Sequence, residues 1–288
     1  MSTIKNWTSL IKLSHTLFSL PFAFIGFGLA YLNNPTNLSW IAFIYMLLAV
    51  FFARNSAMAF NRYIDRDIDS KNERTKDREI PSNKISKEKA IVFITINIFL
   101  FIITTYLINP LAFYLSPIAI ITILFYSYSK RITWLCHYIL GVGLAIAPIG
   151  SYIVLAEQFA MAPLLLSFAV IFWVGGFDIL YALQDEEFDK NENLHSIPQQ
   201  FGRRNALTIS TFSHIITLII LALFGIMYSN SIIYWTGFAL FSSILIWEHL
   251  IIKPSDISRI DIAFATMNAS GSVIFAIFTL IDMFYQYL

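Results

Sequence analysis

The sequence predicts an all-α fold: a polytopic membrane bundle of nine transmembrane helices with a central cavity that opens to the cytoplasmic side. Three observations lead to this prediction: the composition, the spacing of the apolar runs and the distribution of charge between them. Of the 288 residues, 57% are hydrophobic and only 13% are charged, whereas a soluble domain carries about 25% charged residues. This deficit of charge excludes an ordinary soluble domain.

Nine apolar runs define the expected helices. A helix needs about 20 mostly apolar residues to cross a bilayer. Runs of that kind lie at residues 9–32, 39–60, 89–108, 111–128, 135–156, 162–183, 205–228, 231–252 and 262–285. We interpret the first run as a retained helix, because Asn33-Asn34-Pro35 follows it instead of a small-residue cleavage site.

Charge alternates between successive links. The links at 33–38, 109–110, 157–163 and 229–230 contain no Lys or Arg, and those at 61–88, 129–134, 184–204 and 253–261 contain most of them. The positive-inside rule then places the N-terminus and the basic links in the cytoplasm and the C-terminus outside, which requires an odd number of helices. We expect a multi-pass protein of the bacterial inner membrane. It would form a single domain over residues 1–288, with cytoplasmic cap loops at 61–88 and 184–204.

An acidic motif follows the second apolar run. If the helix continues into Asn61-Arg62-Tyr63-Ile64-Asp65-Arg66-Asp67-Ile68-Asp69, then Asn61, Asp65 and Asp69 lie four residues apart on one face. Carboxylate and amide oxygens on one surface suit Mg²⁺, which keeps several waters and takes further ligands from substrate phosphates. Arg62 and Arg66 are expected on another side of the helix, in contact with lipid head groups.

A second acidic motif occurs four helices later. Asp178, Tyr181, Asp185 and Asp189 are expected on one helical face. This recurrence suggests two four-helix pseudo-repeats plus a ninth helix, with both acidic ends facing one cavity. Carboxylates that close together would repel one another, and divalent cations would cancel the repulsion.

Basic residues on the same side complete the expected site. Arg74, Arg78, Lys130 and Arg131 are placed to bind phosphate oxygens, and with the metals they describe a leaving-group site for a diphosphate. In a lipid-embedded enzyme, the most plausible diphosphate is an allylic prenyl diphosphate whose chain lies along apolar helices. We expect Asp65, Asp69, Asp185 and Asp189 to be the catalytic residues.

The same residues resemble signatures of a known family. Asn61-xxx-Asp65-xxx-Asp69 with Arg74-Thr75-xx-Arg78 is similar to the first signature of the UbiA superfamily of intramembrane aromatic prenyltransferases, and Tyr181-xxx-Asp185-xxx-Asp189 is similar to the second. The resemblance implies Mg²⁺ dependence and transfer of a polyprenyl group to an aromatic ring in ubiquinone or menaquinone biosynthesis. It also implies that Asn61 and the four catalytic carboxylates hold the metals, and that Arg74, Arg78 and Lys130 hold the diphosphate. Two departures concern Arg62, where the family often has Asp, and Arg78-Glu79, where it often has Arg-Pro.

The acceptor side follows from the same resemblance. The stretches 177–185 and 194–198 look closest to bacterial 4-hydroxybenzoate polyprenyltransferases and their menaquinone-pathway relatives. Arg54 falls where the family has an arginine near the acceptor, and Tyr126 and Tyr181 are expected beside it. From its position, Asp178 could be a base for the ring proton, a partner of Arg54, or a protonated or hydrogen-bonded residue with a structural role.

Several alternatives remain open from the sequence. The acceptor could be a futalosine-type precursor, a haem vinyl group or a glycerol phosphate lipid. A secondary transporter would instead place its ionisable residues near the bilayer midplane on broken helices. His137 and His249 are expected at the membrane interface. The expected partners are a polyprenyl diphosphate, an aromatic small molecule and the lipid bilayer, with no nucleic acid and no obligatory protein partner.

Overall fold

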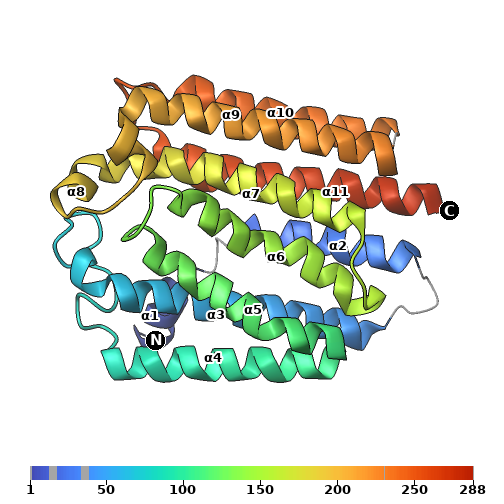
Figure 1. The fold of residues 1–288 in the computed structure, drawn as a ribbon, viewed down its shortest axis with the longest axis horizontal. Coiled ribbons are helices and arrows are strands. Elements are labelled where there is room, and N and C mark those ends of the chain that lie inside the picture. Colours follow the sequence, from blue (N-terminus) through green and yellow to red (C-terminus); the bar gives the residue numbers. More distant parts are fainter. Residues whose placement is uncertain (1, 13–17, 34–38, 230, 288) are drawn as a thin grey trace.

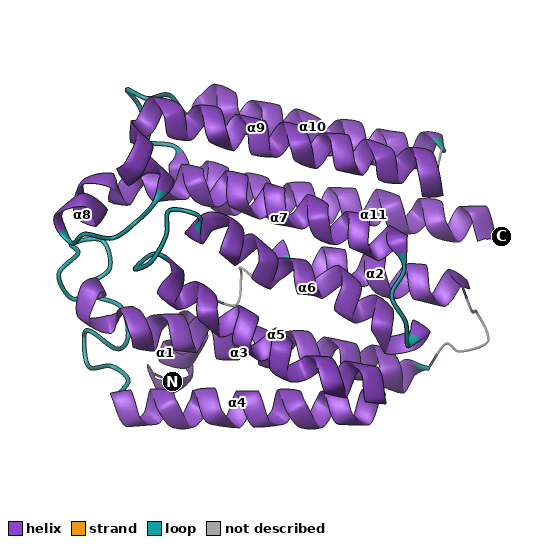
Figure 2. Cartoon of the chain, viewed as in Figure 1, coloured by secondary structure: helices purple, strands orange, loops and turns teal. Residues whose placement is uncertain are grey.

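Helices make up almost all of the fold. The computed structural model describes residues 2–12, 18–33, 39–229 and 231–287, and within these ranges the only β pairing is an isolated bridge between Lys253 and Asp256 (Figure 2). The α-helices are α1 (Ser2–Leu10), α2 (Leu20–Asn33), α3 (Trp40–Asp69), α4 (Lys87–Ile108), α5 (Pro110–Ser129), α6 (Cys136–Ala156), α7 (Met161–Ala182), α8 (Glu186–Asn191), α9 (Ile197–Tyr228), α10 (Ile232–Ile251) and α11 (Asn268–Tyr287). Two short elements join them, the 3-10 turn η3 (Leu183–Asp185) and the π-helical turn η4 (Ile262–Met267).

The described residues place a helix within each of the nine predicted ranges. Seven described helical segments are long and apolar enough to cross a membrane, and α2 is a shorter apolar helix of 14 residues. The protein is therefore an integral membrane protein with several spanning helices. The count of nine crossings stays a prediction.

The first run and the start of α9 differ most from the prediction. The run at 9–32 is not one helix, because α1 ends at Leu10 and α2 begins at Leu20. Pro21 lies in the first turn of α2, where proline costs no hydrogen bond and favours a helix start. At the other long link, α9 begins at Ile197 instead of residue 205, with Ser196 as its N-cap. Gly202, at φ 75°, then interrupts its regular helical geometry.

The basic links all lie at one end of the bundle. In Figure 1, the links after α3, α5, α7 and α10 gather at the left end with α8, and the links after α4, α6 and α9 lie at the right end. This is the separation that the charge alternation predicted. Which end faces the cytoplasm remains a prediction.

An aromatic core holds the second half of the bundle together. Trp173 of α7 is fully buried, and its ring contacts those of Phe22, Phe177 and Phe241 at centroid distances of 5.3, 5.1 and 6.1 Å. Its indole N–H donates to Asn268 Oδ1 at 2.8 Å, as a buried indole requires. This core fixes α7, the helix that carries the start of the second acidic motif.

Helix α6 packs closely between the two halves. A Cβ added at Gly26 of α2 would lie 2.0 Å from the Pro148 carbonyl oxygen of α6, and one at Gly141 of α6 would lie 2.4 Å from the Ile171 oxygen of α7. Small residues at such crossings let helix backbones approach in a membrane. Since α6 is held against α2 and α7, a cavity remains between it, α7, α3 and α5.

Candidate active site

One large cavity of about 1050 Å³ lies between α3, α5, α6 and α7. Almost every site residue predicted from the sequence lines it. These residues are Arg54, Asn61, Asp65, Asp69, Arg74, Arg78, Tyr126, Lys130, Asp178, Tyr181, Asp185 and Asp189. The cavity therefore has a strongly polar head at the end of the bundle where the basic links lie.

The first acidic motif lies on a continuous helix, as predicted. Because α3 extends to Asp69, Asn61, Asp65 and Asp69 follow one another along one face, and both carboxylates are buried. Asn61 Nδ2 donates to Asp65 Oδ2 at 2.9 Å, and Arg78 Nη1 donates to both oxygens of Asp69 at 2.7 and 2.8 Å. Because α3 is continuous here, it fixes the spacing of the side-chain oxygens that we predicted as metal ligands.

Arg131 has a different position from the other three predicted diphosphate ligands. Its Nη2 donates to Asp65 Oδ1 at 2.7 Å and to the Ile64 carbonyl, and its Nη1 donates to the Ser127 carbonyl. Arg131 does not line the cavity, whereas Lys130 does and lies 3.9 Å from Asp65. Arg131 is therefore engaged with Asp65 and two backbone carbonyls in this structure, and its predicted role in diphosphate binding stays a prediction.

The second acidic motif does not lie on one helical face, contrary to the prediction. The α-helix ends at Ala182, the chain tightens into the 3-10 turn over residues 183–185, and α8 follows. Asp178, Asp185 and Asp189 reach the same cavity nevertheless. The change of direction after Ala182 brings the last two of them over the cavity head.

Arg74 connects the two motifs. Its guanidinium forms an ion pair with Asp185, with Nε 3.1 Å from Oδ1, and its Nη1 donates to the Tyr181 hydroxyl at 3.0 Å. Burial alone would lower the pKa of Arg74. The charge of Asp185 and the hydrogen bonds to it outweigh that effect and raise the pKa above its ordinary value. Asn72 donates to the same carboxylate at 3.1 Å. Arg74 thus stays charged at every physiological pH.

The oxygen donors at the cavity head fit Mg²⁺. The described residues contain no group of three or more His, Cys, Asp or Glu that is close enough to hold a metal ion by itself. Mg²⁺ is usually bound by one or two carboxylates together with waters and substrate phosphates. Asp65, Asp69, Asp185 and Asp189 with the amide of Asn61 provide such carboxylates on two sides of one cavity.

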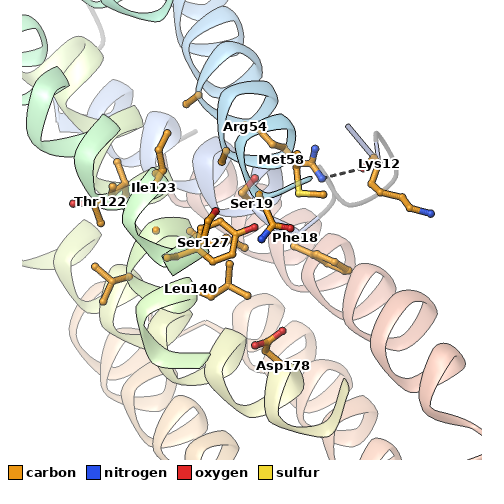
Figure 3. A pocket seen from close by; sticks show the side chains of 18 of the residues that line it. Lys12, Phe18, Ser19, Arg54, Met58, Thr122, Ile123, Ser127, Leu140 and Asp178 are labelled. Carbon is orange, nitrogen blue, oxygen red and sulfur yellow. Dashed lines mark hydrogen bonds between the residues drawn. The ribbon is translucent and has the colours of Figure 1, made fainter. Parts of the chain in front are cut away.

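Arg54 reaches the cavity but is already hydrogen-bonded. Its Nη1 donates to the Ile11 carbonyl at 3.0 Å and its Nη2 to the Lys12 carbonyl at 2.9 Å. These carbonyls follow the end of α1, where backbone acceptors lack helical partners. Figure 3 shows Arg54 beside Lys12 and away from Asp178, so the pair that the sequence allowed between Arg54 and Asp178 is not formed.

Asp178 pairs with His137 instead. The two side chains are 2.7 Å apart, between His137 Nδ1 and Asp178 Oδ2, and the Ile197 N–H donates to His137 Nε2 at 3.2 Å. Because Nε2 accepts that hydrogen bond, the proton of a neutral imidazole lies on Nδ1 and is donated to Asp178. The His137 side chain is buried inside the bundle and hydrogen-bonded on both nitrogens, and its position at the membrane interface stays a prediction.

Arg62 lies on the cavity side of α3, contrary to the prediction that it faces lipid head groups. It is 6% exposed and lines the cavity. Its spacing to Asp65 and Asp69 is three and seven residues, which is the spacing of one helical face. This spacing could have placed Arg62 on the same face as the two carboxylates. It also distinguishes Arg62 from Arg66, which does not line the cavity.

The rest of the cavity is apolar and long. On α3 its lining extends from Met46 to Asp69, about 35 Å at the rise of an α-helix. Toward the other end of the bundle it is lined by Ile108, Ala112 and Val154. A charged head and a long apolar body suit a ligand with an ionic group and a hydrocarbon tail.

A model of the UbiA prenyltransferase family matches residues 19–271 of the chain. The chain belongs to the UbiA prenyltransferase family. It is therefore an enzyme that transfers prenyl groups, and the transporter alternative is not favoured.

Relatives and solved structures agree with this membership. The chain is 27% identical over 236 residues to a 4-hydroxybenzoate octaprenyltransferase of Aliivibrio salmonicida, covering 82% of each chain. It is 29% identical over 242 residues to the protein of the same name from Vibrio campbellii, covering 82% of this chain and 83% of the relative.

Among solved structures, the fold is similar to the apo form of a UbiA homologue from Aeropyrum pernix K1, with a TM-score of 0.83 and 28% identity over 93% of this chain and 98% of that one. A UbiA homologue from Archaeoglobus fulgidus bound to DMAPP and Mg²⁺ has the same fold, with a TM-score of 0.67 and 21% identity over 94% of this chain and 99% of the other.

Proposed function

We propose that this UbiA prenyltransferase moves a polyprenyl group from a polyprenyl diphosphate to 4-hydroxybenzoate in a Mg²⁺-dependent reaction that forms 3-polyprenyl-4-hydroxybenzoate in quinone biosynthesis. The observation that carries the proposal is the cavity itself, which joins a carboxylate- and arginine-lined head to a long apolar body. The names of the Aliivibrio and Vibrio relatives support the acceptor, and the Archaeoglobus homologue supports the metal.

The cavity head would receive the diphosphate. Asn61 and the four carboxylates Asp65, Asp69, Asp185 and Asp189 would hold Mg²⁺, which when bound neutralises the charge that develops on the leaving diphosphate. Arg74, Arg78 and Lys130 would bind phosphate oxygens from the same head. Charge-assisted hydrogen bonds of this kind are strong and directional, and they stabilise the departing group.

The apolar body would hold the prenyl chain. Its lining includes the exposed side chains of Ile118, Val142 and Phe159, from α5, α6 and the link after α6. Because these residues line the cavity and are also exposed on the outside of the bundle, they mark a lateral opening toward lipid. Through such an opening, a chain longer than the cavity would extend into the bilayer.

Two links would close the head against water. Lys71 pairs with Glu192 at 2.6 Å, and Asn72 and Arg74 bind Asp185, so the link after α3 is tied to the segment that follows α7. An allylic cation formed beneath them would be protected from capture by water. These links correspond to the predicted caps, which we place on the cytoplasmic side of a bacterial inner membrane.

Asp178 would accept the ring proton. The prenyl cation adds to the acceptor ring carbon ortho to its hydroxyl, and the carbon–hydrogen bond there breaks to restore the aromatic ring. Since the His137 N–H donates to Asp178, this carboxylate is held in place and is ready to accept a proton. Tyr126 and Tyr181 line the same region and would position the acceptor ring.

The test uses membranes that contain the protein, radiolabelled 4-hydroxybenzoate and a polyprenyl diphosphate, with Mg²⁺ or with EDTA. We expect Mg²⁺-dependent transfer of label into a lipid-extractable product. Diphosphate release that requires a futalosine-type acceptor, without transfer to 4-hydroxybenzoate, would keep the chemistry and change the substrate. No diphosphate release with any acceptor would contradict the proposed function.

A further inference from the structure

Arg62 is a buried cation without a hydrogen-bond or ion-pair partner among the described residues. Its side chain is 6% exposed and lines the cavity. Its Nε is fully buried with no hydrogen bond, and none of its nitrogens forms a hydrogen bond or ion pair with any described residue. A charge kept out of water without a partner is costly, and inside a membrane protein such a residue is usually functional.

The other arginines that line the cavity are all engaged. Arg54 donates to two backbone carbonyls, Arg74 pairs with Asp185 and Arg78 pairs with Asp69. Arg62 alone among these four forms no hydrogen bond or ion pair with a described residue. A guanidinium presents a planar fork of N–H donors that matches a carboxylate or a phosphate, and it does not give up its proton.

Arg62 also lies where both substrates of the proposed reaction must meet. It precedes Asp65 by one helical turn on α3, so it stands between the carboxylate head and the apolar body of the cavity. It interacts electrostatically with Tyr126 and with Asp69, Arg78 and Glu79 of the head, but no carboxylate of the described residues is close enough to form an ion pair. A negatively charged ligand group at this level would complete its hydrogen bonds.

We propose that Arg62 binds a negatively charged oxygen group of a substrate, either the carboxylate of the aromatic acceptor or an oxygen of the prenyl diphosphate. The inference rests on the proposed function and deepens it, because it assigns a substrate-binding role to a residue of the first acidic motif that is neither a proposed metal ligand nor a proposed diphosphate ligand. Unlike Arg54, which already donates to the Ile11 and Lys12 carbonyls, Arg62 has no hydrogen-bond or ion-pair partner among the described residues.

The experiment measures binding without turnover. The variants are Arg62→Gln and Arg62→Lys, and Arg66→Gln is the matched control, because Arg66 lies one turn further along α3, stacks on Tyr63 and pairs with Asp67 outside the cavity. One arm measures binding of a non-ionising prenyl thiodiphosphate with Mg²⁺ to detergent-solubilised protein. The second arm measures binding of 4-hydroxybenzoate to protein already loaded with that analogue.

We expect Arg62→Gln to weaken one of the two ligands about tenfold to a hundredfold, which is usual when one partner of a buried charged pair is removed. The other ligand should bind within about twofold of wild type. Arg62→Lys should recover part of the loss, because it keeps the charge and not the fork. A loss in the acceptor arm assigns Arg62 to the carboxylate, and a loss in the diphosphate arm assigns it to the phosphate.

Unchanged binding of both ligands to Arg62→Gln, or an equal loss in Arg66→Gln, would overturn the inference. If the wild type binds both ligands but transfers no prenyl group, the proposed function fails and the binding arms still decide the role of Arg62. If the wild type binds neither ligand, both proposals fail.

Discussion

Asp65→Asn is expected to lower the rate of prenyl transfer about a thousandfold, the largest effect of any single change considered for this protein. Asp65 is buried at the cavity head, where it accepts hydrogen bonds from Asn61 and Arg131 and faces Lys130. The substitution keeps the size of the side chain and removes the charge. In the proposed reaction that charge would hold Mg²⁺ against the leaving diphosphate.

Asp67→Asn provides the matched control. It changes the same residue type two positions further along α3, but Asp67 is 73% exposed and does not line the cavity. Initial rates with saturating Mg²⁺ and both substrates are compared for the two variants, together with their resistance to heat in detergent. Near-normal transfer by Asp65→Asn, in a protein as stable as wild type, would show that the metal ligands are misassigned.

Asp178→Asn is expected to lower kcat about a hundredfold or more, the usual contribution of a general base. The amide keeps the shape of the side chain and accepts the His137 hydrogen bond through its oxygen, but it does not take up a proton at neutral pH. Binding of the prenyl diphosphate should remain near wild type, because Asp178 lies deeper along α7 than the phosphate-binding residues.

His137→Gln separates catalysis from positioning at this site. We expect His137 to act through Asp178. It donates a hydrogen bond to that carboxylate and accepts one from the Ile197 N–H. The variant should therefore lose less activity than Asp178→Asn, and combining the two changes should add little to Asp178→Asn alone. A wild-type kcat for Asp178→Asn would exclude this carboxylate as the base.

Much of the fold follows from the sequence because a bilayer imposes simple lengths and charge rules. Apolar runs of about 20 residues and alternating basic links predicted the helices and the end at which the site lies. The break between α1 and α2 was not predicted, because the run at 9–32 is apolar throughout its later part and Pro21 is compatible with a kink as well as with a helix start. Hydropathy alone does not distinguish the two.

The site was predictable where it depends on helical spacing within one helix. Asn61, Asp65 and Asp69 share a face because α3 continues through them. The second motif followed a different course, since a 3-10 turn after Ala182 redirects the chain and no residue in Leu183–Asp185 signals that turn.

Contacts between distant parts of the chain could not be predicted from the sequence. The pair of His137 and Asp178, 41 residues apart, depends on how α6 packs on α7. The hydrogen bonds of Arg54 to Ile11 and Lys12, more than 40 residues away, depend on where α1 ends. In both cases the sequence shows a polar side chain within a helix, but tertiary packing determines which group it binds.

The most direct test of the central claim is an experimental structure of the protein with Mg²⁺ and a non-ionising prenyl thiodiphosphate. We expect the diphosphate at the cavity head, within reach of Asp65, Asp69 and Asp185 through Mg²⁺ and of Arg74 and Arg78 directly. The prenyl chain should extend along α3 toward Met46. A diphosphate bound away from these carboxylates, or a chain that leaves the cavity without entering its apolar body, would contradict the account.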